Sequence, residues 1–280
     1  MRLATVRTAL GATNAVRIDE GRMLDTGYPD VGSLLSDKGW RVVAQSATAE
    51  VEALAVKPFA PLVTRPSKIV CVGLNYRNHI LEMGRDLPEY PTLFSKFAES
   101  LVGAEDDISM PAETDEFDWE CELAIVIGSP VRRATEAEAE DAIAGFTVLN
   151  DITCRDWQFR TREWLQGKSW ESTTPIGPLL VTPDELSGGV RPDLAISTSI
   201  DDELMQSNRT GDLLFDPVDL VRYISILTTL HPGDIIATGT PGGVGHARQP
   251  ARYLSAGEIV VTEIDGIGTC RNLVVADPGR

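Results

Sequence analysis

The sequence predicts an α+β fold that is rich in β-strands, with a small N-terminal β-rich domain ahead of a larger one. Three observations support this. Strand-like apolar segments outnumber helical ones, strands and helices do not alternate as in Rossmann folds or TIM barrels, and a proline-rich segment interrupts the chain early. With 280 residues, 42% of them hydrophobic, the chain can bury a large core.

The N-terminal domain and its linker are predicted to occupy residues 1–62, and the larger domain residues 63–280. The N-terminal part contains short strand-like segments broken by Gly and Asp, namely Leu3–Val6, Ala15–Ile18 and Trp40–Val43. The segment Lys57–Lys68 contains three prolines and is typical of a linker.

The larger domain is predicted to begin with a buried strand, Lys68–Gly73, and a short helix, Leu74–Gly84, which a glycine ends. A second helix is expected over Thr135–Phe146, where Thr135 and Glu138 have the spacing of a capping box. Further strands are expected at Phe117–Gly128, Phe146–Asp151, Leu194–Ile200, Asp234–Ala237 and Ile259–Ile264. A helix is expected over Asp216–Leu230, with Pro217 in its first turn.

The charge of the chain argues against polyanionic partners. The 42 acidic residues exceed the 25 lysines and arginines, which gives a formal net charge of −17. Nucleic acid and anionic membranes are therefore disfavoured, although a local basic pocket for a small anion remains possible.

The four cysteines are scattered and form no zinc motif, so we expect reduced core thiols. The first 21 residues lack the apolar run of a signal peptide, and no segment approaches the ~20 apolar residues of a membrane span. We therefore expect a soluble, cytoplasmic protein.

The predicted strand Phe117–Gly128 carries three acidic residues, Asp118, Glu120 and Glu122, which alternation places on one face. Asp151 ends another apolar strand. A shared cation would explain why charges occur there, and oxygen ligands without His or Cys favour Mg²⁺, Mn²⁺ or Ca²⁺. Two alternatives remain open: a solvated strand face, or salt bridges with residues such as Arg155 or Lys168.

Other candidates are individually weaker. His79 and Glu82 lie at i and i+3 of a predicted helix, where a carboxylate could orient an imidazole as a general base or form an exposed ion pair. Lys168 lies in the segment Gly167–Pro178, which is rich in Gly, Ser, Thr and Pro and is predicted to be a loop, and it could bind a substrate oxygen or lie on the surface. The glycine-rich segment Ala237–Ala247 fits no phosphate-loop motif, and is either a close backbone approach to an anion or a plain turn.

Six motifs in order, taken together, are far more specific. They are VGLNYRNHILEMG, WECELAIVIG, LNDITCRDWQ, GKSWESTTPIGP, PGDIIATGTPGGVG and IDGIGTCRN, and they cover roughly Lys68 to Val275. Their order resembles the fumarylacetoacetate hydrolase family, in particular the short branch with acylpyruvate hydrolases, oxaloacetate decarboxylases and hydroxymuconate-type isomerases.

The resemblance implies a mixed β-roll, a homodimer, a role in aromatic catabolism and Mg²⁺ or Mn²⁺ held by Glu120, Glu122 and Asp151. Asp118 is then expected in the second shell or in solvent. The same resemblance implies a catalytic His79–Glu82 pair on a lid-like segment and a catalytic Lys168. It also implies substrate contacts from four residues: Arg155, Gln158, Gly239 and Thr240.

Two sequence features bear on the substrate. The segment Thr92–Ser100 is expected to shape the pocket, and the Arg- and aromatic-rich segment after Cys154 could favour a larger or anionic substrate tail. The main hypothesis is hydrolysis of a C–C bond in a 2,4-dioxo acid of the acylpyruvate or fumarylpyruvate type. The alternatives are decarboxylation or isomerisation of a 2-oxo acid, or a non-enzymatic binding role.

Overall fold

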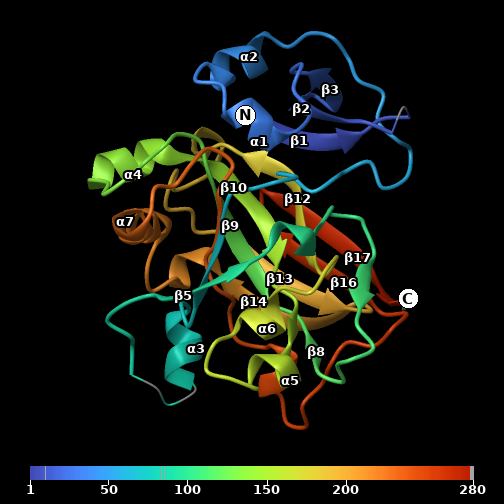
Figure 1. Ribbon diagram of the computed structural model, residues 1–280, viewed down its shortest axis with the longest axis vertical. Coiled ribbons are helices and arrows are strands. Elements are labelled where there is room, and N and C mark those ends of the chain that lie inside the picture. The colour runs from blue at the N-terminus through green and yellow to red at the C-terminus, as the bar shows by residue number, and fades with distance from the viewer. Residues whose placement is uncertain (10, 83, 85, 278–280) are drawn as a thin grey trace.

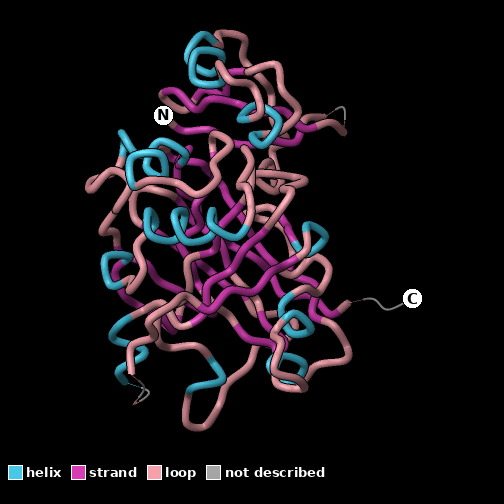
Figure 2. Tube along the Cα trace, turned by 60° about the vertical axis from the view of Figure 1, so that its left-hand side comes forward, coloured by secondary structure: helices cyan, strands magenta, loops and turns pink. Residues whose placement is uncertain are grey.

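The computed structural model describes residues 1–9, 11–82, 84 and 86–277, apart from the side chains of His79 and Glu82. Strands run through the middle of the molecule, and the helices lie mainly around its outside (Figures 1 and 2). The predicted β-rich α+β fold is therefore confirmed.

The largest sheet has ten strands in the order β3-β2-β1-β12-β10-β9-β15-β4-β5, with β6 also paired to β12. Most neighbours are antiparallel, but β15 and β4 are parallel, so the sheet is mixed. Its strands are β1 (Arg2–Arg7), β2 (Thr13–Asp19), β3 (Arg22–Asp25), β4 (Ile69–Gly73), β5 (Thr92–Lys96), β6 (Leu101–Val102), β9 (Cys121–Ile127), β10 (Ile143–Asn150), β12 (Thr174–Val181) and β15 (Ile235–Ala237).

A five-stranded sheet and a two-stranded sheet complete the β-structure. The five-stranded sheet contains, in spatial order, β14 (Glu203–Arg209), β13 (Ala195–Ile200), β16 (Ile259–Ile264), β17 (Gly268–Ala276) and β7 (Ile108–Met110). The short strands β8 (Phe117–Asp118) and β11 (Thr153–Cys154) pair with each other. Side chains from the two larger sheets pack together in one core, where Leu123 and Phe146 meet Ile196 and Ile264.

The helices are short. They are α1 (Val31–Leu35), α2 (Trp40–Ser46), α3 (Arg77–Glu82), α4 (Glu136–Ala142), α5 (Arg155–Gln158), α6 (Leu165–Lys168) and α7 (Pro217–Leu227). Single 3₁₀ turns are η1 (Ala98–Ser100), η2 (Pro183–Glu185), η3 (Thr210–Asp212) and η4 (Gly245–Ala247). The capping box of α4 is present as predicted: the Thr135 hydroxyl accepts from the Glu138 N–H, and the Glu138 carboxylate accepts from the Thr135 N–H.

Four sequence predictions about elements are wrong. The helix predicted over Thr135–Phe146 ends at Ala142, and residues 143–146 already belong to β10. Trp40–Val43 is helical, because Trp40 and Ala44 share one buried helix face while Val42 is 69% exposed. The predicted loop Gly167–Pro178 contains the end of α6 and the start of β12. The predicted strand Phe117–Gly128 is interrupted at residues 119–120, so Asp118 belongs to β8 and Glu122 to β9.

The N-terminal strands extend the main sheet, because β1 pairs with β12 at Arg2↔Val181 and Leu3↔Leu180. The division of the chain at residue 62 stays a prediction.

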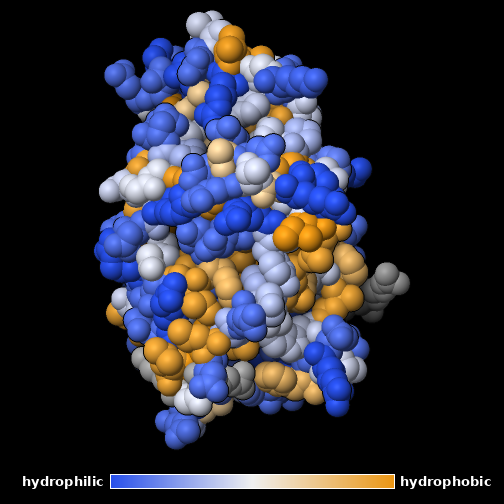
Figure 3. All heavy atoms as spheres, turned by 90° about the vertical axis from the view of Figure 1, so that its left-hand side faces the viewer, coloured by the Kyte–Doolittle hydropathy of each residue, from blue (hydrophilic) through white to orange (hydrophobic). Residues whose placement is uncertain are grey.

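One side of the molecule carries exposed apolar residues. Figure 3 shows hydrophobic side chains gathered over the lower half of the side that bears α7 in Figure 1. The exposed large hydrophobic residues include Tyr90, Ile226 and Leu227. Homodimer formation stays a prediction. No helix among the described residues has the length and hydrophobicity to cross a bilayer.

The central core makes a direct prediction about stability. Phe146 on β10 is fully buried, so Phe146→Ala should lower the free energy of unfolding by about 3–5 kcal/mol. Chemical denaturation followed by tryptophan fluorescence measures this. Val42→Ala is the control and should change stability little, because that side chain is mostly exposed. Equal effects from both variants would contradict the assignment of this core.

Candidate functional site

The pairing of two buried strands brings three acidic residues together. Glu122 on β9 lies opposite Leu149 on β10, and the Asp151 N–H donates to the Glu120 carbonyl oxygen at 2.8 Å. All three acidic residues are buried, and one carboxylate oxygen from each lies within 4.8 Å of the other two. The antiparallel register of β9 and β10 therefore builds an oxygen-lined cluster, here called the acid cluster (Glu120, Glu122 and Asp151).

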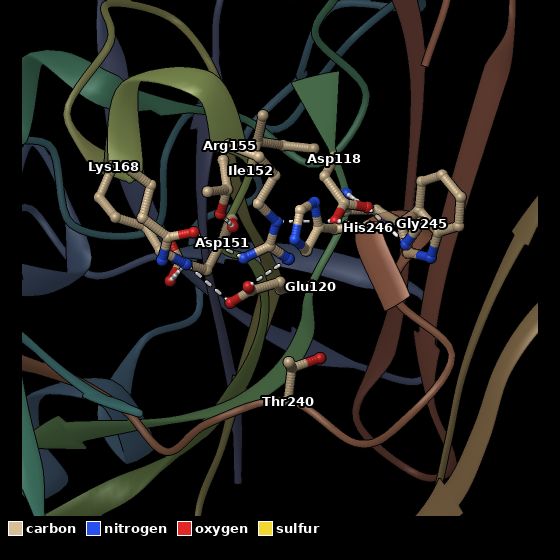
Figure 4. A network of polar contacts seen from close by, with 12 residues as sticks. Asp118, Glu120, Asp151, Ile152, Arg155, Lys168, Thr240, Gly245 and His246 are labelled. Atoms are coloured by element: carbon tan, nitrogen blue, oxygen red, sulfur yellow. Dashed lines mark hydrogen bonds and ion pairs between the residues drawn. The ribbon is translucent and has the colours of Figure 1, made fainter. Parts of the chain in front are cut away.

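Three buried cations contact the acid cluster. Figure 4 shows two of them, Lys168 and Arg155, with Glu120 and Asp151. The Lys168 ammonium bridges Glu120 Oε2 and Asp151 Oδ2, each at 2.7 Å. Lys96 from β5 contacts Asp151 Oδ1 at 2.7 Å, and Arg155 Nη2 contacts Glu120 Oε1 at 2.7 Å. These ion pairs compensate for the removal of the charges from water.

Glu122 differs from the other two acids in its partners. Its Oε2 accepts from the Gly239 N–H at 2.7 Å, and no cation among the described residues pairs with it. Burial, followed by repulsion from Asp151 and Glu120, raises the pKa of Glu122 well above its usual value. The negative charge at this position is therefore undercompensated.

The pairing sets the charge state of the other groups. Burial favours a protonated Asp151, but Lys168 and Lys96 outweigh it, so that the pKa of Asp151 is lowered. Burial likewise disfavours the Lys168 ammonium, but Asp151 and then Glu120 outweigh it and raise the pKa of Lys168. Lys168 is thus held as a cation beside ionised carboxylates.

Asp118 lies outside the acid cluster but is not in solvent. It is fully buried, accepts from Arg155 Nε at 2.8 Å, and accepts from the backbone N–H groups of Trp119 and Gly245 at 2.8 and 2.7 Å. Asp118 was expected either to contact a residue that holds the acid cluster or to lie in solvent. The first expectation is correct, because Arg155 pairs with both Asp118 and Glu120.

The acid cluster fits a divalent cation. Three carboxylates supply only oxygen donors, which Mg²⁺ and Mn²⁺ prefer. The four buried acids (the cluster and Asp118) face three buried cations, Lys96, Arg155 and Lys168, which leaves one negative charge over. The solvated-face alternative is wrong because the acids are buried. The salt-bridge alternative is correct for Glu120 and Asp151, and it coexists with the donor set for a metal.

The position of Lys168 depends on a close helix contact. α6 packs against α5, and a Cβ atom at Gly167 would lie 2.6 Å from both the Cys154 carbonyl oxygen and the Gln158 Cβ. Only glycine permits this approach, which brings the next residue, Lys168, to the acid cluster. The sequence motif around this lysine is therefore explained by packing as well as by chemistry.

A cavity of about 250 Å³ opens beside the acid cluster. Its lining includes Glu120, Glu122, Lys168, Arg155, Gln158, Thr240 and His246, together with apolar residues such as Phe94 and Trp164. This volume suits a small organic molecule.

Three of the four predicted substrate contacts, Arg155, Gln158 and Thr240, line this cavity, and Gly239 is not in its lining. The Gly239 N–H is engaged by Glu122, and Arg155 pairs with Asp118, Glu120 and Gln158. The His79 and Glu82 side chains lie outside the described residues, although α3 begins three residues after the cavity residue Leu74.

Sequence reasoning missed three contributors. Lys96 holds Asp151, Gln206 donates to the Thr240 hydroxyl at 2.8 Å, and His246 lines the cavity. Lys96 is a charged residue in the segment Thr92–Ser100, and nothing in its sequence context indicates a partner. Gln206 lies on β14, a strand that was not predicted from the sequence.

Comparison with known proteins agrees with this arrangement. The fumarylacetoacetate (FAA) hydrolase C-terminal family matches residues 68–275. The chain belongs to this family. It is 43% identical over 218 residues to rat oxaloacetate tautomerase Fahd2a, mitochondrial, covering 78% of this chain and 69% of the relative.

Two solved structures extend the likeness. The 5-carboxymethyl-2-hydroxymuconate delta-isomerase from Mycobacterium smegmatis is 31% identical with a TM-score of 0.81, covering 100% of both chains. The fumarylpyruvate hydrolase from Pseudomonas aeruginosa, in complex with Mn²⁺ and pyruvate, is 33% identical with a TM-score of 0.67, covering 75% of this chain and 89% of that one. The predicted family and branch are confirmed.

Replacing Glu122 should separate metal binding from stability. Glu122→Gln keeps an acceptor for the Gly239 N–H but removes a charge that burial disfavours, so the metal-free protein should keep or slightly increase its stability. Divalent metal affinity should fall by more than about tenfold, since even second-shell changes cost about that much. Calorimetric titration with Mn²⁺ checks this, and unchanged affinity would remove Glu122 from the ligand set.

Asp118→Asn is the matched comparison, with the opposite outcome expected. Metal affinity should largely persist, whereas stability should fall by about 1.5–3 kcal/mol, because Arg155 loses a charged hydrogen-bond acceptor. Denaturation and Mn²⁺ titration of the same sample measure both. Loss of the metal with stability intact would mean that the roles of the two acids are reversed.

Proposed function

We propose that this chain is a divalent-metal-dependent enzyme that interconverts the keto and enol forms of a small 2-oxo acid of the oxaloacetate type. Decarboxylation of such an acid is the nearest alternative. The observation that carries the proposal is the acid cluster of three buried carboxylates beside a cavity of small-molecule size. The names of the rat and mycobacterial relatives, a tautomerase and an isomerase, support proton transfer over hydrolysis.

Glu120, Glu122 and Asp151 would hold the cation, which we propose to be Mg²⁺ or Mn²⁺. When bound, it supplies positive charge close to the carboxylate and 2-oxo oxygens of the substrate. The Mn²⁺ held by the Pseudomonas relative supports this choice.

Lys168 would stabilise the charge that develops during the reaction. When a proton leaves the carbon next to the 2-oxo group, negative charge accumulates on the oxygen of the resulting enolate. Lys168 is a buried ammonium whose pKa is raised, and it lines the cavity, so it can donate a hydrogen bond to that oxygen. The water-poor surroundings strengthen this interaction.

The remaining groups would orient the substrate and move the proton. Gln158 and Thr240 line the cavity and can donate hydrogen bonds to substrate oxygens. His79, oriented by Glu82, remains the proposed general base, on a helix that begins three residues after Leu74 of the cavity lining.

Hydrolytic C–C cleavage of an acylpyruvate is a second candidate. The observation that favours it is the likeness to the fumarylpyruvate hydrolase with bound pyruvate. Both reactions pass through a pyruvate-type enolate, and they differ in whether His79 must activate a water molecule. The same cavity could therefore support either reaction.

A direct assay tests the main proposal. Purified protein should accelerate the enol-to-keto conversion of oxaloacetate, followed by ultraviolet absorbance above the spontaneous rate. Exhaustive chelation should abolish the acceleration, and added Mg²⁺ or Mn²⁺ should restore it. Activity that survives chelation would refute the metal requirement, and absence of acceleration in the metal-loaded protein would refute the tautomerase proposal.

A second assay discriminates between the reaction classes. Oxaloacetate, acetylpyruvate, fumarylpyruvate and a hydroxymuconate analogue are incubated with the metal-loaded protein, and the products are identified. Tautomerisation leaves the carbon skeleton intact, whereas hydrolysis releases pyruvate and a second acid, and decarboxylation releases CO₂. If acetylpyruvate is cleaved, and His79→Ala abolishes the cleavage, hydrolysis becomes the better assignment.

A further inference from the structure

Beside the acid cluster and Lys168, the cavity lining combines the polar side chains of Arg155, Gln158 and Thr240 with apolar ones, among them Val72, Leu74, Phe94, Phe159, Trp164 and Val244. A further polar side chain in the lining is His246, on the η4 turn that follows the glycine-rich segment. Neither the metal donor set nor the proposed proton transfer uses this side chain.

The backbone of His246 is fixed to the site through Asp118. The N–H groups of Gly245 and His246 donate to the two oxygens of Asp118 at 2.7 and 3.1 Å. A Cβ atom at Gly245 would collide with the Arg252 carbonyl oxygen and lie 2.8 Å from Asp118, so glycine is required for this approach. Because Asp118 also binds Arg155, the position of His246 is tied to the acid cluster (Figure 4).

The ring of His246 is also held. Its Nδ1 lies 3.0 Å from the Tyr253 hydroxyl oxygen, and the ring packs against Phe159 at a centroid distance of 5.0 Å. Nε2 has no hydrogen bond to the described residues. A ring that is oriented through one nitrogen, and that lines a cavity, can present the other nitrogen to a ligand.

Two cations that line the cavity are already paired with protein groups. The Arg155 guanidinium forms ion pairs with Asp118 and Glu120 and donates to Gln158, although its Nη2 makes no hydrogen bond of good geometry to the described residues. The Lys168 ammonium faces Glu120 and Asp151. Both cations are thus held by protein carboxylates, whereas, among the described residues, His246 carries no ion pair and is the imidazole in the cavity lining.

We propose that His246 determines specificity by binding the second carboxylate of a 2-oxo dicarboxylic acid, with Tyr253 holding the ring in place. This rests on the proposed function, since it assumes that the 2-oxo end of the substrate lies at the acid cluster. The substrate class becomes 2-oxo diacids in preference to 2-oxo monoacids of equal chain length.

The test measures binding without turnover, on the Mn²⁺-loaded full chain. Affinities are measured by calorimetry for matched pairs of stable acids, 2-oxoglutarate against 2-oxopentanoate and 2-oxoadipate against 2-oxohexanoate. Wild type should prefer the diacid of at least one pair. His246→Ala should weaken binding of that diacid by about tenfold or more, the size expected for a hydrogen bond to a charged group, and change the monoacid by less than about twofold.

Two further variants separate recognition from structure. His246→Gln keeps an N–H donor and should recover part of the diacid preference, and Tyr253→Phe should lose part of it by freeing the ring. His231→Ala, a histidine outside the cavity lining, is the matched control and should bind like wild type. In turnover, His246→Ala should raise KM for a diacid more than it lowers kcat.

The outcomes are distinguishable. If His246→Ala lowers the affinity for the diacid and the monoacid equally, the histidine only shapes the pocket and the proposal is overturned. Unchanged affinity for both acids would also overturn it. If wild type prefers diacids through His246 but does not accelerate oxaloacetate enolisation, the proposed reaction fails while the assignment of His246 stands. If enolisation is seen without any diacid preference, only the assignment of His246 fails.

Discussion

The structure depends on keeping charged carboxylates stable in a buried position, where little of their surface can reach solvent. An ionised carboxylate without a partner in the interior costs several kcal/mol, and breaking a buried pair is comparably costly. Here Lys168 bridges two acids, Lys96 and Arg155 each take a further carboxylate oxygen, and backbone N–H groups serve Asp118 and Glu122. The acids, the lysines and the loops around them therefore form one interdependent unit.

That unit imposes conditions on distant parts of the chain. The β9–β10 register must place Asp151 beside Glu120, and the loop after β15 must bring the Gly239 N–H to Glu122. Gly167 must let α6 approach α5 so that Lys168 arrives between two carboxylates. Residues that look unrelated in sequence are therefore constrained by the same electrostatic requirement.

Much of this was predictable from local pattern. The buried strands followed from apolar runs, the start of helix α4 from its capping box, and the link between Glu120, Glu122 and Asp151 from charges on apolar strands, whereas the family resemblance set Asp118 apart from them. Other features were not predictable. Trp40 and its neighbours have strand-like composition but pack as a helix, and Lys96 looks like any strand charge until the fold brings it to Asp151. Residues linked only by tertiary packing leave no trace in the periodicity of the sequence.

The salt bridges and the proposed metal are compatible for a simple reason. An ionised carboxylate can accept about four hydrogen bonds, and Asp151 accepts one from Lys96 and one from Lys168. Glu122 accepts one from a backbone N–H and none from a cation among the described residues. The lysines thus keep Asp151 ionised while capacity for a further cation remains. At Glu122, whose pKa is raised, a bound cation would take the place of a proton. Ion pairs and a metal, which the sequence left open as alternatives, are therefore compatible at one site.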